Sequence, residues 1–75
     1  MLEYSIGSSM ERDDLYAELS FNRNQWGEIV LSEDKKTVNI IIYPDPGIEL
    51  NFNYSDFLML IETAKRRLLE IEGLV

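Results

Sequence analysis

The side chains that most often carry catalysis are missing from this chain. It contains no histidine and no cysteine, which removes the commonest general base, the commonest metal ligand and the thiol nucleophile. Disulfides are also excluded as a source of stability. Most hydrolytic mechanisms therefore have no residues to perform them, and we expect neither a metal ion nor a cofactor.

The remaining candidates for catalysis are carboxylate pairs and one pair of serines. The carboxylate pairs are Asp13-Asp14, Glu33-Asp34 and Glu70 with Glu72. They fall in expected turns or at a helix end, where solvated surface charge is the simplest interpretation. Ser8 and Ser9 have no nearby histidine or lysine to activate a hydroxyl. Since phosphate-binding glycine loops, zinc-protease motifs and calcium loops are missing as well, we predict that the protein is not an enzyme.

The charge balance favours a basic partner over nucleic acid. The sequence contains fourteen acidic residues and seven basic ones, so its net charge is −7. This charge opposes binding to phosphate backbones. The basic cluster at 65–67 spreads around a helix, so charge compensation in the helix's C-terminal half explains it better than phosphate recognition does. No secretion signal and no run of about 18 apolar residues occurs. We therefore expect a cytoplasmic protein that contacts neither membrane nor nucleic acid.

Hydrophobic periodicity supplies the elements that must position any binding residues. A period of two predicts strands over 15–21, 26–31 and 37–43, with polar turns at 22–25 and 32–36. The Pro44–Gly47 segment ends the third strand, and a short strand is expected at 48–52. Met1–Ile6 adds a possible edge strand, followed by a turn at 7–9.

The period changes to that of a helix after the last strand. Apolar residues recur at helical spacing at Phe57, Leu60, Ile61, Ala64, Leu68 and Ile71. Asn53 or Ser55 can cap the first turn, and Gly73 can end the helix. We therefore predict an α+β fold, in which an antiparallel meander of about four strands is followed by one C-terminal helix on one sheet face. The length of 75 residues limits the chain to a single domain, 1–75.

A helix on one side leaves the other sheet face open, and strand alternation predicts which side chains occupy it. The residues expected to face the helix are Leu15, Leu19, Ile29, Leu31, Val38, Ile40, Ile42, Leu50 and Phe52. Val30 and Glu49 are expected to face outward. The candidate partner-binding residues on the open face are Tyr16, Glu18, Trp26, Glu28, Ile41 and Tyr43. A β-bulge at Gly27 would instead move Trp26 to the core side.

Three interpretations of this aromatic and acidic face stay open at this point. It can be ordinary cross-strand packing on a wet sheet, a homodimer interface, or a recognition surface for a different protein. Large exposed apolar patches on monomers are uncommon without a use, which favours the two interaction hypotheses.

The order of elements also carries a resemblance. The segments 26–31, 40–44, 54–57 and 64–68, spelled WGEIVL, IIIYP, YSDF and AKRRL, resemble small bacterial immunity-type proteins that accompany secreted polymorphic toxins. Acidic phage-encoded inhibitors of bacterial defence systems are similar in size and charge. The resemblance implies a binder that occludes a basic enzyme site, often that of a nuclease. The region to test would be the acidic first half, including Glu11, Asp13, Asp14, Glu18 and Glu28.

The sequence therefore favours a noncatalytic, acidic protein-binding module, most simply an inhibitor or immunity protein whose partner has a basic, nucleic-acid-processing surface. The alternative is a homodimeric structural or accessory subunit that associates through the open sheet face.

Overall fold

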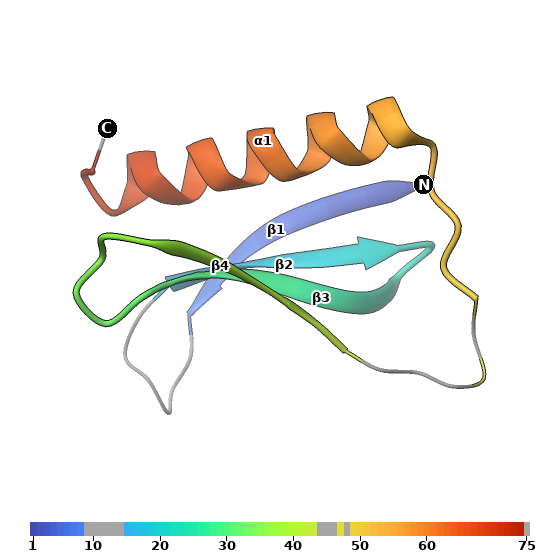
Figure 1. Cartoon of the computed structure of the whole chain (residues 1–75), viewed down its shortest axis with the longest axis horizontal. Coiled ribbons are helices and arrows are strands. Elements are labelled where there is room, and N and C mark those ends of the chain that lie inside the picture. The colour runs from blue at the N-terminus through green and yellow to red at the C-terminus, as the bar shows by residue number, and fades with distance from the viewer. Residues whose placement is uncertain (9–14, 44–46, 48, 75) are drawn as a thin grey trace.

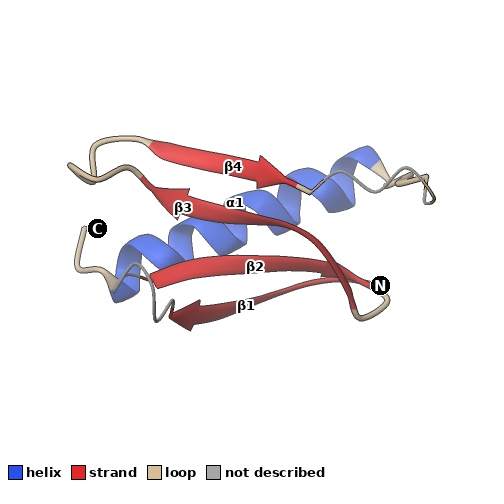
Figure 2. Ribbon diagram, turned by 90° about the horizontal axis from the view of Figure 1, so that it is seen from below, coloured by secondary structure: helices blue, strands red, loops and turns tan. Residues whose placement is uncertain are grey.

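The chain is an α+β meander with one helix, as predicted. The computed structural model describes residues 1–8, 15–43, 47 and 49–74. One antiparallel sheet contains β1 (Leu2–Ser8), β2 (Leu15–Phe21), β3 (Asn24–Leu31) and β4 (Val38–Ile42), in that spatial order. The helix α1 (Tyr54–Ile71) lies on one face of the sheet, and among the described residues no helix lies on the other face (Figure 1; Figure 2 views the sheet with α1 behind it).

The strands at both edges of the sheet differ from the prediction. The possible edge strand is confirmed as β1, but it continues through Gly7 and Ser8, which were expected to form a turn. The strand predicted at 48–52 is wrong for its described residues, which form no strand; Ile48 lies outside them. Phe52 instead packs its ring against Phe21, with the centroids 5.3 Å apart. An aromatic ring buries more apolar area in such a cluster than at a sheet edge, which explains the change.

Each hairpin turn has a backbone conformation that its residues support. Asn22 and Arg23 both have positive φ, at 50° and 71°, the geometry of the two-residue turn that matches strand twist. The turn is therefore shorter than the predicted 22–25, and β3 already begins at Asn24. In the next hairpin Lys35 has φ 62° and donates its amide to the Ser32 carbonyl at 2.8 Å.

Local capping defines both ends of α1. Of the two predicted caps, Asn53 is the one used, since its side chain accepts the amide of Asp56 at 3.0 Å. Gly73 follows the helix with φ 75°, a left-handed conformation that glycine adopts without steric cost. The Leu74 amide then donates to the Leu69 carbonyl at 2.9 Å. This pattern is a Schellman motif, which satisfies carbonyls that the helix would otherwise leave without donors.

The helix packs mainly on β1 and β2 rather than on β3 and β4. The fully or nearly fully buried apolar residues of this core are Ala17, Leu19, Trp26, Ile29, Leu60, Ala64 and Leu68. Ile71 belongs to the same predicted helical stripe but is 42% exposed, because it is the last residue of the helix. The core therefore occupies the space between α1 and the first three strands.

The off-centre helix leaves β4 uncovered. Val38, Ile40 and Ile42 pair with Leu31, Ile29 and Gly27 and so lie on the helix side of the sheet, as predicted. They are nevertheless 36%, 45% and 59% exposed. Leu50, also expected to face the helix, is 39% exposed outside any strand. The expected burial of these four residues is wrong, because one helix is too narrow to cover four strands.

Candidate functional site

The open sheet face brings together five of the six predicted partner-binding residues. The β2–β3 register sets Tyr16 opposite Val30 and Glu18 opposite Glu28. The β3–β4 register then sets Glu28 opposite Ile41. Tyr43 lies just past β4 and joins this side through its hydrogen bond to Glu28. We call the sheet surface that carries Tyr16, Glu18, Glu28, Ile41 and Tyr43 the open face, and Figure 2 looks onto it.

Trp26, the sixth residue, lies on the opposite side. Leu19 pairs with Gly27 whereas Ser20 pairs with Gln25, so Trp26 is the extra residue of a β-bulge. Its side chain is 4% exposed and belongs to the core under α1. The prediction that Trp26 faces outward is wrong, because an extra residue breaks the alternation on which it depended.

Gly27 shows why the bulge sits at this position. A Cβ atom added to Gly27 would lie 2.6 Å from the carbonyl oxygen of Ile41, closer than nonbonded atoms can approach without a backbone shift. Just past β4, the Tyr43 amide donates to the Trp26 carbonyl at 2.9 Å. A glycine inside a strand pattern was therefore the available signal for the bulge, one residue after the bulged Trp26.

Tyr43 and Glu28 form the ordered centre of the open face. The Tyr43 hydroxyl donates to Glu28 Oε1 at 2.6 Å and accepts from Gln25 Nε2 at 3.1 Å. Glu28 is 8% exposed, so its carboxylate is held rather than free to sample rotamers. Burial raises the pKa of Tyr43 to about 12, and the hydrogen bond to Glu28 and the negative charge on Glu28 act in the same direction.

The raised pKa of Tyr43 predicts a distinct step in an alkaline titration. In wild type, tyrosinate absorbance should include a step near pH 12, and Tyr43→Phe should remove that step. Because the folded pKa is raised above the ordinary value of about 10, the stability linked to Tyr43 is fully present below pH 10 and is lost as the pH rises through about 12. Urea unfolding across that range measures the loss. Tyr54→Phe, at a side chain that is 76% exposed, is the matched control and should leave the step in place.

The charge distribution of the sheet is one-sided. The four strands contain three charged residues, Glu3, Glu18 and Glu28, and no lysine or arginine. Glu3 pairs with Ser20, whose strand parity matches that of Glu18, so all three glutamates project to the open face. No three carboxylates within the described residues come close enough together to hold a metal ion.

In the other carboxylate pairs of the sequence, Asp34 and Glu72 form hydrogen bonds or ion pairs with their neighbours in space. Asp34 accepts from the Ser32 hydroxyl at 2.6 Å and from the Lys36 amide at 3.0 Å. These hydrogen bonds lower the pKa of Asp34, that from Ser32 most. Glu72 pairs with Lys35 at 2.9 Å, which connects the end of α1 to the β3–β4 turn.

The remaining acidic candidates are a helix glutamate and the acidic residues that precede β2 in the sequence. Glu70 forms an ion pair with Arg67 at 3.3 Å, as expected for solvated helix charges. Glu11, Asp13 and Asp14, which the resemblance implicates, lie outside the described residues, as does Ser9. The acidic residues of the first half that project to the open face within the described residues are therefore Glu3, Glu18 and Glu28.

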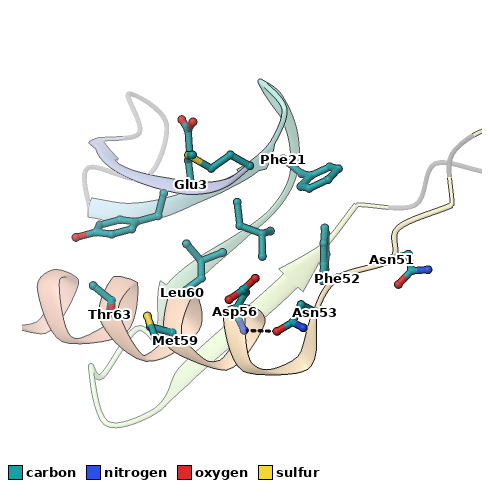
Figure 3. Close-up of a pocket in the computed structure, with 12 residues that line it drawn as sticks. Glu3, Phe21, Asn51, Phe52, Asn53, Asp56, Met59, Leu60 and Thr63 are labelled. Atoms are coloured by element: carbon teal, nitrogen blue, oxygen red, sulfur yellow. Dashed lines mark hydrogen bonds between the residues drawn. The ribbon is translucent and has the colours of Figure 1, made fainter.

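Two surfaces were missed by sequence reasoning. One is the exposed apolar edge of β4, already described. The other is a groove between β1 and the first half of α1, with Phe21 and Phe52 at one end (Figure 3). Apart from the bulged Trp26, alternation gives the correct side for the candidate residues, but it contains no information on where a helix stops covering the sheet.

Comparison with known proteins gives no assignment. No protein-family model matches this chain, and no match was found among curated proteins or solved structures. Along the described part of the chain, no helix combines the length and the apolar character needed to cross a bilayer.

Proposed function

We propose that this protein is a noncatalytic module that binds a second protein with a basic surface through the open face. The observation that carries the proposal is the one-sided charge of the sheet: every charged residue in its strands is a glutamate on that face. A face of uniform sign attracts an oppositely charged partner and repels acidic ones.

The aromatic and aliphatic residues of the open face supply contact area beside these charges. Tyr16 and Tyr43 are partly buried, and Ile41 is 39% exposed on the edge strand. Tyrosine suits an interface because its ring gives a large contact at low entropic cost while its hydroxyl can hydrogen-bond. The Tyr43 hydroxyl donates a hydrogen bond to Glu28 and accepts one from Gln25, and these bonds hold the ring in place before binding. This reduces the entropy lost on association.

An inhibitor or immunity protein is the form of this function that we favour. Carboxylates on a small rigid scaffold can occupy the site where a nucleic-acid-processing enzyme binds phosphates. The resemblance to immunity-type proteins supports this form, and we propose a cytoplasmic location for it. In this proposal the protein binds the basic enzyme and does not bind nucleic acid directly.

The test compares charge reversal on the two faces of the molecule. A partner captured by wild type from the source cell, or from its natural competitor, would be purified and its binding measured by biolayer interferometry. Glu18→Lys should slow association about tenfold at low salt, with a smaller effect at high salt because screening removes the steering. Glu62→Lys makes the same charge change on exposed α1 and should alter the rate less than about twofold.

A contact variant completes this test. Ile41→Ala removes exposed contact area from an edge strand and should weaken binding by about 1–2 kcal/mol without unfolding the protein. Equal effects of Glu18→Lys and Glu62→Lys would show that net charge matters and the open face does not. A partner without a basic surface would also contradict the proposal.

Self-association is the second candidate, and one observation favours it. β4 is an edge strand without charged residues, and Val38, Ile40, Ile41 and Ile42 along it are all at least 36% exposed. Unprotected apolar edges tend to pair with another strand. Sedimentation equilibrium at low micromolar concentration should then give a dimer that Ile40→Lys dissociates. A monomer under these conditions would contradict this candidate.

A further inference from the structure

The free edge of β1 presents backbone groups and side chains that suit an added strand. β1 pairs with β2 and lies at the edge of the sheet. The Asn22 amide donates to the Met1 carbonyl at 3.2 Å, so the pairing at Met1 is of the hydrogen-bonded type. Antiparallel strands alternate between bonded and non-bonded pairs, and the β1–β2 register has no bulge. The backbone groups of Leu2 and Tyr4 therefore point toward the free edge.

The same two residues direct their side chains toward the helix. Leu2 and Tyr4 pair with Phe21 and Leu19, and Leu19 is buried in the core under α1. A residue that paired antiparallel with Leu2 or Tyr4 would place its own side chain on that same side. Alternate residues of an added strand would thus face α1.

The space on that side is open. α1 crosses the strands obliquely (Figure 2), and a groove of about 760 Å³ lies between the first half of β1 and the first half of the helix. Its apolar lining includes Leu2, Phe21, Phe52, Met59 and Leu60, and Figure 3 shows how these elements surround it. The volume is in the range of pockets that bind ligands.

The charges around the groove select a cationic occupant. Glu3 and Asp56 are the charged side chains among the described residues that line it, and lysine and arginine are missing from that lining. The N-terminal ammonium of Met1 also lies at the groove, where it donates to the side-chain oxygen of Asn22, so the two carboxylates leave the lining with a net negative charge. Glu3 projects to the open face, opposite in parity to Leu2 and Tyr4. A cross-strand neighbour of Glu3 would also lie on that outer face, where opposite charges stabilise a strand pair.

We propose that β1 and α1 bind an extended segment of a second protein, which adds to the sheet as an antiparallel fifth strand. Its apolar side chains enter the groove, and its alternate, basic side chains lie beside Glu3 on the outer face. Backbone hydrogen bonds to Leu2 and Tyr4 supply affinity, and the groove supplies side-chain selectivity, as in other cases of strand addition. This site is separate from the contact residues Ile41 and Tyr43, since β2 and β3 lie between β1 and β4.

The test uses a fluorescein-labelled peptide of alternating lysine and valine, about seven residues long to match a typical strand. Fluorescence anisotropy should detect saturable binding that a peptide with glutamate in place of lysine weakens at least about tenfold. Raising the salt from about 0.05 M to about 0.5 M should weaken the binding as well. On addition of the peptide, the largest changes in backbone amide chemical shift should occur at Leu2 to Tyr4 rather than in β4.

Backbone methylation tests strand pairing directly. In the proposed register the valine amides donate to β1 and the lysine amides point away from it. Methylating the valine amides should therefore weaken binding at least about tenfold, whereas methylating the lysine amides should change it less than about threefold. The reverse pattern would overturn the antiparallel register. Equal binding of the valine-methylated and the lysine-methylated peptide would overturn strand addition.

Two adjacent helix positions provide matched protein variants. Met59 lines the groove and is 69% exposed, whereas Leu58 is 43% exposed and does not line it. Met59→Lys should weaken peptide binding about tenfold, and Leu58→Lys, with the same change in charge, less than about twofold. Equal effects, or no binding of the peptide to wild type, would overturn the proposal. Ile41→Ala should leave the peptide affinity unchanged, so failure of the open face as a binding site would be distinguished from failure of the groove.

Discussion

Replacing Leu68 with aspartate should leave the protein without a cooperative unfolding transition. Leu68 is fully buried, and it is one of the three largest side chains that the structure buries completely, with Leu19 and Ile29. Loss of its packing costs about 2–5 kcal/mol, and burying a carboxylate without a partner costs several kcal/mol more, or forces it to take up a proton. A domain of 75 residues has a total stability of about 4–11 kcal/mol. The substitution therefore removes most or all of it.

Thermal unfolding followed by circular dichroism measures this effect, and one-dimensional NMR reports whether methyl dispersion is lost. Ile71→Asp is the matched control, because Ile71 belongs to the same helical stripe but is 42% exposed. We expect Ile71→Asp to lower the free energy of unfolding by less than about 1.5 kcal/mol. A normal transition for Leu68→Asp would mean that the helix turns a different face to the sheet.

Trp26→Ala should lower the free energy of unfolding by about 3–5 kcal/mol, the range for removing a large aromatic side chain from a core. The Trp26 ring is 4% exposed. Its centroid lies 5.0 Å from that of Phe52 and 6.0 Å from that of Phe57. The cavity would open where the chain after β4 meets the first turns of α1, so both contacts would be lost together. Urea denaturation followed by circular dichroism at 222 nm measures the change without relying on tryptophan fluorescence.

A conservative variant and an exposed control make the Trp26 result interpretable. The Trp26 indole nitrogen is buried and has no hydrogen-bond partner among the described residues, so Trp26→Phe loses ring area but no hydrogen bond. We expect Trp26→Phe to cost less than half as much as Trp26→Ala. Tyr54→Ala, at a side chain that is 76% exposed, should cost about 0.5 kcal/mol or less. Near-wild-type stability of Trp26→Ala would mean that this side chain faces solvent after all.

The sequence by itself determined the elements and most of the side-chain directions, because both depend on local periodicity. The helical stripe through Leu60, Ala64 and Leu68 and the alternation of Tyr16 and Glu18 with Ala17 and Leu19 required no knowledge of distant contacts. The cap at Asn53 and the stop at Gly73 are likewise local backbone chemistry. For the same reason, five of the six predicted open-face residues could be named in advance.

The tertiary structure decided what local rules cannot contain. Gly27 left a bulge open as an alternative, and the tertiary structure selected it: the bulge moved the Trp26 side chain into the core, where its ring packs against Phe52. Phe52 packs in the same aromatic cluster and does not extend the sheet beyond β4. The fourth strand of the sheet is β1, which pairs with β2 at the opposite edge. The position of α1 over β1 and β2 exposed β4 and opened the groove beside Leu2. Which strands a helix covers depends on its position across the sheet, and hydrophobic periodicity along the chain does not indicate that position.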